Sequence, residues 1–215
     1  MLTISASPPS VNWRDLTTRL FGSMWFLFLA ATMVNGALSD LRSMQALSRI
    51  SLSVFYILLW WLILSRPPAL SQAKGLMPRL AAFIGTYMPW CISFTARSED
   101  PVLNMVSAVV VTAGMLLTII TVLHLGRSFS LVPQVRRLVQ VGPYRYIRHP
   151  LYLAEEVAVL GAVLQFLSPM TVLIFLMHIG FQVLRISYEE RLLSQTLPEY
   201  AQYAASRWRL VPFVW

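Results

Sequence analysis

The sequence predicts an all-α integral membrane protein with four transmembrane helices, a C-terminal membrane helical hairpin broken near Pro169, and a cytoplasmic interfacial tail. Three observations predict this class. The 215 residues are 57% hydrophobic and only 12% charged, whereas about a quarter of the residues in soluble domains are charged. Uncharged apolar runs of membrane-spanning length recur along the chain. Most basic residues lie in the segments between those runs.

Four apolar runs are predicted to cross the membrane. They are residues 20–38, residues 50–65 with an extension back to about residue 47, residues 80–96 and residues 102–125. The third run contains Pro89, which we expect to kink its helix because proline has no N–H to donate. Residues 1–19 are partly charged and lack a convincing cleavage site, so no cleaved signal peptide is predicted.

A longer apolar stretch, from residue 151 to about residue 187, is predicted to form a helical hairpin. It is too long for one ordinary span, and Ser168-Pro169 interrupts it. We therefore expect a turn at residues 167–169, followed from residue 189 to residue 215 by a charged and aromatic segment at the membrane surface. Residues 1–125 then hold the first four helices, and residues 126–215 hold a polar loop, the hairpin and the tail. Both parts form one integrated membrane domain.

The distribution of basic residues predicts the orientation. The formal net charge is +8. With the N-terminus in the cytoplasm, 14 of the 17 Lys and Arg residues lie in inside segments, and only Arg42, Arg49 and Arg97 lie outside. Because cytoplasmic loops carry the excess of Lys and Arg, we expect both termini and both polar C-terminal segments in the cytoplasm. The basic balance indicates loops against anionic lipid and not a nucleic-acid partner.

Metal and disulfide chemistry are not predicted. Cys91 is the only cysteine, so an internal disulfide is impossible and a thiolate metal site has too few ligands. Cys91 lies in an apolar run and is predicted to be a small packing residue. His124 and His178 lie in apolar runs and are predicted to be hydrogen-bonded packing residues. No cluster of His and carboxylate residues indicates a metal.

One polar segment, residues 142–152, has the pattern of a rigid elbow before a helix. Gly142-Pro143 is a turn signal. His149 precedes a proline and is pushed towards an extended backbone, while Pro150 suits the first turn of a helix. The elbow should therefore present Arg148, His149 and Tyr152 together at a helix N-terminus, which attracts negative charge.

A pair of carboxylates, Glu189-Glu190, is predicted to meet the elbow. Adjacent carboxylates at the end of an apolar helix need partners, and Arg185 is spaced four residues before Glu189 for a pair within the helix. The hairpin returns this end to the elbow. Acidic, basic and aromatic groups together suit a zwitterionic, partly aromatic ligand such as S-adenosylmethionine.

These motifs, in this order, resemble the isoprenylcysteine carboxyl methyltransferase and phospholipid methyltransferase superfamily. The similarity covers about residues 122–212, including Leu125-Gly126-Arg127-Ser128-Phe129-Ser130 before the elbow and Pro198-Glu-Tyr200-x-x-Tyr203 after the acidic pair. The resemblance implies S-adenosylmethionine in a cytoplasm-facing pocket and a lipid-like acceptor entering from the bilayer. It makes the loop at residues 126–150 the cofactor-binding loop, with cofactor residues Tyr144, Arg148, His149, Pro150, Tyr152, Glu189 and Glu190. Which glutamate faces the cofactor stays open.

A second acidic pair, Glu155-Glu156, follows the elbow by less than two turns. One alternative is that a member of this pair satisfies Arg145, Arg148 or Arg185. The other is that it lines the acceptor pocket, as a general base or as the partner of a cationic head group. Arg127 is a guide for a carboxylate acceptor or a loop arginine that binds lipid phosphate. Candidate catalytic residues are Arg127, Glu156 and Glu190, and candidate substrate-binding residues are Glu155, Glu156 and Arg127.

The predicted function is methyl transfer from S-adenosylmethionine to a membrane-partitioned carboxylate, amine or thiol. Two alternatives stay open. One is a nicotinamide-dependent membrane reductase related to sterol reductases, whose C-terminal half is related, although this chain is short for that class. The other is a non-enzymatic transporter or assembly factor, although few polar residues lie in the middle of the first four spans.

Overall fold

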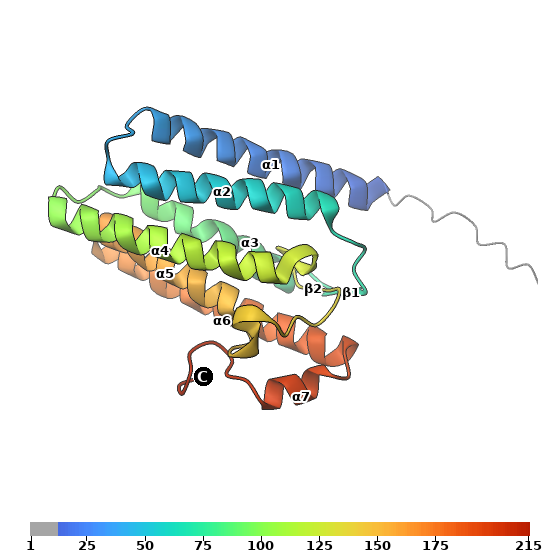
Figure 1. Ribbon diagram of the computed structural model, residues 1–215. Coiled ribbons are helices and arrows are strands. Elements are labelled where there is room, and N and C mark those ends of the chain that lie inside the picture. Colours follow the sequence, from blue (N-terminus) through green and yellow to red (C-terminus); the bar gives the residue numbers. More distant parts are fainter. Residues whose placement is uncertain (1–12) are drawn as a thin grey trace, which may run out of the picture.

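The computed structural model describes residues 13–215, which form a bundle of antiparallel helices (Figure 1). Two very short strands and three 3-10 segments connect the helices. In chain order the elements are α1 (Trp13–Leu38), α2 (Met44–Ser65), β1 (Ser71–Gln72), α3 (Met77–Tyr87), η1 (Met88–Phe94), α4 (Pro101–Leu125), η2 (Gly126–Ser128), β2 (Gln134–Val135), η3 (Gly142–Arg145), α5 (Pro150–Gln165), α6 (Pro169–Thr196) and α7 (Tyr200–Ala205).

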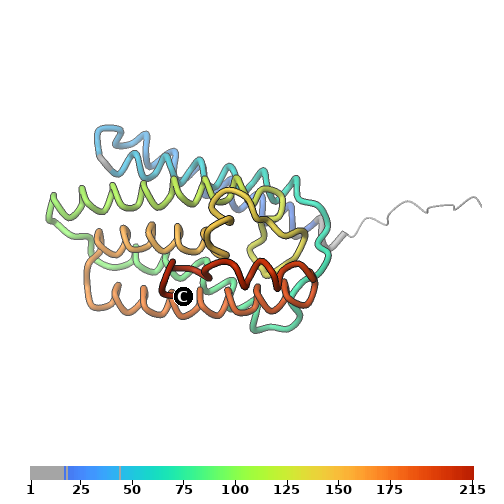
Figure 2. Tube along the Cα trace, turned by 60° about the horizontal axis from the view of Figure 1, so that its bottom comes forward, coloured from blue at the N-terminus to red at the C-terminus, as the bar shows by residue number. Residues whose placement is uncertain are grey.

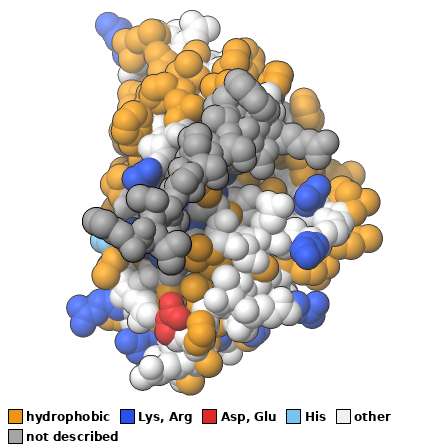
Figure 3. Space-filling view, turned by 90° about the vertical axis from the view of Figure 1, so that its right-hand side faces the viewer, with side chains coloured by type: hydrophobic (Ala, Val, Ile, Leu, Met, Phe, Trp, Pro, Cys, Tyr) orange, Lys and Arg blue, Asp and Glu red, His pale blue; other side chains and the backbone are white. Residues whose placement is uncertain are grey.

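One end of the bundle, called here the loop end, gathers segments that are far apart in the sequence. Residues 66–76, residues 126–149 and the C-terminal end of α6 lie there (Figures 1 and 2). Strand β1 pairs with β2 in antiparallel fashion, with Ser71 opposite Val135. Figure 3 looks onto this end and shows Lys and Arg side chains around its rim. The polar loops predicted to lie on one side of the membrane are therefore together.

The all-α integral membrane class is confirmed, but one of the four expected spans differs. Among the described residues, four helices are long and apolar enough to cross a membrane: Arg19–Leu38, Gln45–Ser65, Pro101–Ser128 and Pro169–Thr196. The last is the second arm of the hairpin. The run predicted at residues 80–96 is instead the 11-residue α3 followed by the 7-residue η1. Pro89 has no N–H for the carbonyl of Gly85, so the α-helix ends. The two pieces together still cover about 30 Å.

The hairpin turns where the sequence predicts, but its arms are unequal. Ser168 caps α6, and its side chain and that of Thr171 form a capping box. Helix α5 has 16 residues, whereas α6 has 28 and runs to Thr196. The helix continues through Glu189 and Glu190, because it meets no breaker until Leu197, the residue before Pro198. Both glutamates are therefore held on a regular helix.

Helix α5 packs closely along α4 through small residues. A Cβ atom on Gly114 would lie 2.4 Å from the backbone nitrogen of Ala158, and one on Gly161 would lie 2.6 Å from that of Val111. The hydroxyl of Ser107 donates to the carbonyl of Gly161 at 2.7 Å. Small residues let membrane helices approach to backbone contact, so the position of α5 on α4 is closely defined.

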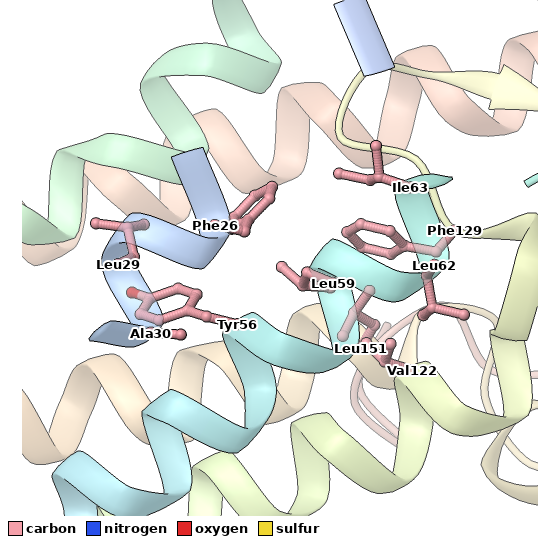
Figure 4. Packing of buried hydrophobic residues seen from close by; sticks show 10 residues of the cluster. All are labelled: Phe26, Leu29, Ala30, Tyr56, Leu59, Leu62, Ile63, Val122, Phe129 and Leu151. Atoms are coloured by element: carbon pink, nitrogen blue, oxygen red, sulfur yellow. The ribbon is translucent and has the colours of Figure 1, made fainter. Parts of the chain in front are cut away.

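A hydrophobic cluster connects the first two helices to the start of α5 (Figure 4). Phe26 of α1, Leu59 of α2 and Val122 of α4 are buried in it, together with Phe129 and with Leu151, which is part of the segment 142–152. Because lipid is as apolar as these side chains, close packing and not removal from water holds the cluster together. The cluster therefore fixes the elbow against the N-terminal helices.

The outside of the bundle is apolar, as expected for a lipid-facing surface. Large hydrophobic side chains stay exposed on every long helix, for example Phe21 on α1, Leu116 on α4 and Leu176 on α6. Cys91 of η1 is also exposed, so its prediction as a packing residue is wrong. The reason is that an apolar side chain can face lipid as favourably as it faces a protein interior.

Candidate active site

The elbow, residues 142–152, adopts the rigid bend that its glycine and prolines predict. Gly142 has φ 59°, and a Cβ atom there would lie 2.1 Å from the ring of His124, so this position requires glycine. Segment η3 follows, and α5 begins at Pro150 with His149 as its N-cap residue. The elbow thus directs the side chains of His149 and Tyr152 towards α6.

The C-terminal tail holds the backbone of the elbow. The N–H of Arg148 donates to the carbonyl of Trp208 at 2.8 Å, and the N–H of His149 donates to the carbonyl of Arg209 at 3.1 Å. The hydroxyl of Tyr203 donates to the carbonyl of Tyr144 at 2.8 Å. Burial raises the pKa of Tyr203 to about 12, so this hydroxyl keeps its proton. The tail was expected only to lie on the membrane surface, yet it is part of the site.

Glu190 forms the centre of a buried ionic cluster. Its Oε1 accepts from Nη1 of Arg148 at 2.8 Å and lies 3.2 Å from Nε2 of His149. Its Oε2 accepts from Nη2 of Arg209 at 2.7 Å. The carboxylate therefore connects α6, the elbow and the tail. Arg209 was not predicted, because no local spacing connects it with residue 190. Glu190 itself does not line the cavity described next.

Glu189 has a different environment from its neighbour. Its Oε2 accepts from the hydroxyl of Tyr152 at 2.8 Å and lies 4.0 Å from Nδ1 of His149. Its side chain stays 34% exposed, against 10% for Glu190, and it lines the cavity. Of the two glutamates, Glu189 is thus the one that presents a carboxylate to the cavity.

A single cavity extends from the elbow into the helical bundle and has a polar and an apolar part. The polar part is lined by elbow, α6 and α7 residues: Tyr144, Arg148, His149, Tyr152, Glu189 and Tyr200. The apolar part is lined by residues of α1, α2, α3, η1 and α4: Phe26, Tyr56, Tyr87, Trp90, Met115 and Thr118. The indoles of Trp25 and Trp90 stack with centroids 5.9 Å apart and connect α1 with η1. Burial and the nearby Glu189 raise the pKa of Tyr144 well above its usual value.

Charged groups lie where the two parts join. Glu155 lines the cavity, and its Oε2 accepts from Nε2 of Gln182 at 3.0 Å. The other end of that amide accepts from Nη1 of Arg185 at 2.8 Å, and the guanidinium lies over the ring of Tyr152 at 4.9 Å. No ion pair joins Arg185 to Glu189 within the described part of the chain, so that expected pair is absent. Gln182 instead connects Arg185 with Glu155.

Glu156 turns away from the cavity lining and towards α6. Its Oε1 lies 3.2 Å from Nδ1 of His178. The expectation of an arginine partner for the second acidic pair is therefore wrong for Glu156 and only indirect for Glu155. The signal that could have found these partners is the spacing of His178, Gln182 and Arg185, which places three polar residues on one face of an otherwise apolar helix.

Arg127 and Pro150 contribute to the framework. Nε of Arg127 donates to the carbonyl of Ser65, and the side chain does not line the cavity, so the expected guide for a carboxylate acceptor is not positioned there. Pro150 begins α5. In the described residues, no group of three or more His, Cys, Asp or Glu side chains is arranged to hold a metal ion.

Comparison with known families agrees with this architecture. A model of a membrane methyltransferase family matches the segment that contains α4, the elbow and α6, and together with the four long apolar helices this match supports a membrane methyltransferase in general. The family is described as phospholipid methyltransferase, and residues 101–199 match it. The matched family belongs to the superfamily that the elbow and the Glu-Glu pair resemble, which confirms that resemblance. No curated protein matches the chain.

Proposed function

We propose that the protein transfers a methyl group from S-adenosylmethionine to an amine carried by a lipid or another membrane-partitioned molecule. The observation that carries this proposal is the single cavity with a polar part at the elbow and an apolar part among the membrane helices. A soluble cofactor and a lipid-like acceptor need two such environments side by side. Methyl transfer itself mainly requires that the two be positioned and water excluded.

The polar part has the chemistry that S-adenosylmethionine requires. Glu189 is an exposed carboxylate for its cationic groups. Arg148 lines the cavity while one of its nitrogens binds Glu190, and it suits the carboxylate of the ligand. Tyr144 and Tyr200 line the same part and suit the adenine. Bound there, the cofactor supplies an electrophilic methyl group on a sulfonium. In this proposal Glu190 positions the elbow and does not touch the cofactor.

An amine is favoured over a carboxylate as acceptor because of the charges at the junction. Glu155 lines the cavity there, and a carboxylate attracts an ammonium and repels a second carboxylate. Arg127, the expected partner of a carboxylate acceptor, binds Ser65 instead. We propose that Glu155 takes one proton from the acceptor ammonium, which frees the nitrogen lone pair for attack on the methyl carbon. The proton then leaves from the Glu155 carboxyl.

The loop end is proposed to face the cytoplasm. The excess of basic residues in the segments that meet there supports this orientation. It also places the polar part on the side from which a soluble cofactor arrives. Cysteine-accessibility labelling of single cysteines at positions 145 and 97, in a Cys91→Ala background, should give cytoplasmic labelling at position 145 and external labelling at position 97. The reverse pattern contradicts the orientation.

The acceptor is tested with the purified protein in vesicles that contain either an amine-headgroup phospholipid or a fatty acid, together with methyl-labelled S-adenosylmethionine. Label in the amine lipid supports the proposal, whereas label in a fatty-acid ester contradicts the amine assignment. Glu155→Gln should reduce transfer about 100-fold or more and keep cofactor binding. Glu99→Gln, a change outside the cavity, is the matched control. Equal transfer by both variants excludes Glu155 as the base.

A further inference from the structure

The contact between Glu156 of α5 and His178 of α6 lies at membrane depth and outside the proposed reaction. Oε1 of Glu156 is 3.2 Å from Nδ1 of His178, and the two side chains are 15% and 1% exposed. Neither oxygen of Glu156 accepts a hydrogen bond from another described residue. A buried carboxyl with a single neighbour of this kind needs an explanation, because an unpaired charge in lipid is expensive.

The other ring nitrogen of His178 fixes which nitrogen faces Glu156. Nε2 lies 2.9 Å from the carbonyl oxygen of Gly85. A carbonyl only accepts, so Nε2 carries a hydrogen and donates it. This carbonyl lacks its usual helical donor because the residue four positions later is Pro89. The break between α3 and η1 thus orients the imidazole and leaves Nδ1 for Glu156.

Hydrogen-bond chemistry then requires one proton between the two groups. A neutral ring with its hydrogen on Nε2 would point the lone pair of Nδ1 at a carboxylate oxygen, and two lone pairs repel. The contact is stable if Nδ1 is protonated and the ring is an imidazolium beside a carboxylate. It is equally satisfied if Glu156 carries the proton and donates to Nδ1. In both cases the Glu156–His178 pair is neutral as a whole.

The number of protons on the Glu156–His178 pair matters because other charged groups lie next to it. Helix α5 contributes Glu155 and the phenol of Tyr152, and α6 contributes Arg185. Helix α3, with Tyr87, and η1 contribute no charge to the cavity lining. The only titratable residue of α4 is His124, whose ring lies against Gly142 of the elbow. With a neutral pair, the charges next to it are the Glu155 carboxylate and the Arg185 guanidinium, which Gln182 connects and which balance each other.

We propose that Glu156 and His178 share one proton, and that this neutral pair leaves Glu155 as the one ionised carboxylate at the junction of the cavity. Glu156 and His178 are then positioning residues. The use of Glu155 as a base rests on the proposed function, whereas the shared proton does not. Without His178, Glu156 would lose its partner beside the Glu155 carboxylate, and one of the two carboxyls would have to take up a proton.

The proton is tested directly by nitrogen NMR of protein labelled in its histidine rings, with no turnover needed. The chain has three histidines, so His178→Gln and His124→Gln assign the signals. We expect Nδ1 of His178 to be either protonated or a strong hydrogen-bond acceptor at neutral pH. A bare Nδ1, with neither a proton nor a hydrogen bond, overturns the proposal whatever the protein catalyses.

A double-mutant cycle measures the same property through thermal stability. In His178→Gln the new amide can still donate to the Gly85 carbonyl but cannot hold the shared proton, so this change should lower Tm by several degrees. Adding Glu156→Gln removes the stranded carboxyl and should recover at least half of that loss. The control pair, His124→Gln with Glu156→Gln, should be additive. A His178→Gln/Glu156→Gln protein no more stable than His178→Gln contradicts the shared proton.

Transfer activity then tests the link to Glu155 separately. His178→Gln should move the acid limb of the pH–rate profile to higher pH, with cofactor affinity within twofold of the wild type. The double variant should return the limb towards its original position. An unchanged profile in an active His178→Gln enzyme removes the pair from control of Glu155. If the wild type itself is inactive on every acceptor, the proposed function fails and the NMR result still decides the proton.

Discussion

The two faces of α5 differ sharply. Towards α4, the contact is made by Gly114, Ala158 and Gly161 at backbone distance. Towards α6, the same helix presents Tyr152, Glu155 and Glu156, each with a polar partner on that neighbour. The first face is close-packed and uncharged, whereas the second borders the cavity and holds these three polar contacts.

The difference shows how a small membrane protein holds charges at depth. Polar partners at 2.8–3.2 Å tolerate little displacement. Backbone contact on the α4 face fixes the axis of α5, so its opposite face can keep such distances to α6. If this account is right, damage to the close-packed face should weaken the polar face, and damage to the polar face should leave unpaired charges.

The largest effect on stability is expected for Glu190→Gln. The change keeps the side-chain shape but leaves Arg148, His149 and Arg209 without their shared anion. Breaking a buried ionic cluster from one side costs about 3–5 kcal/mol. Thermal unfolding in detergent measures it, with Glu199→Gln as the matched control on an exposed side chain, expected within about 0.5 kcal/mol. Equal Tm values for both variants would show that the cluster does not hold the elbow.

A smaller loss of stability is expected for a substitution where α5 packs against α4. Gly114→Ala places a Cβ atom 2.4 Å from the nitrogen of Ala158, so α5 must shift, and overpacking of this kind costs about 1–3 kcal/mol. Gly180→Ala on α6 is the control, because its Cβ atom meets nothing within 4 Å. It should be neutral or stabilising by up to about 1 kcal/mol. Cofactor affinity should fall for Gly114→Ala and not for Gly180→Ala.

The smallest loss of stability is expected for a substitution where the C-terminal tail binds the elbow. Tyr203→Phe removes the hydroxyl that donates to Tyr144 and should cost about 1 kcal/mol. Tyr146→Phe is the control, since Tyr146 is 68% exposed. The difference in Tm between the two variants is the measurement. A Tyr203→Phe protein as stable as Tyr146→Phe would contradict a structural role of the tail.

The structural features that were predicted correctly from the sequence are those that nearby residues determine. Gly142, Pro150 and Ser168-Pro169 each constrain the backbone by themselves, so the elbow and the hairpin turn were correctly expected. The apolar runs predicted the spans for the same reason. Pro89 was expected to kink a helix. A proline inside an apolar run predicts an interruption of the α-helix, but it does not distinguish a kink from a change to a 3-10 segment.

Partners from distant segments could not be predicted. Arg209 meets Glu190 only because the tail returns beneath the elbow, and His178 meets Glu156 only through the particular angle between α5 and α6. Which of Glu189 and Glu190 faces the cavity also depends on α6 continuing past residue 187, since neighbours on a helix differ by about 100° in direction. Of the two alternatives for the second acidic pair, the arginine partners are replaced by a neutral and a weakly basic partner, Gln182 and His178, which only the packing of α5 on α6 brings close.

The central claim, that the polar part binds S-adenosylmethionine through Glu189, is tested most directly by calorimetric titration of the purified protein. The wild type should bind S-adenosylmethionine and not a reduced nicotinamide. Glu189→Gln should weaken binding by about 10- to 100-fold, the equivalent of one charged hydrogen bond, while the control Glu99→Gln should bind like the wild type. Binding of the nicotinamide, or undiminished S-adenosylmethionine affinity in Glu189→Gln, would contradict the account.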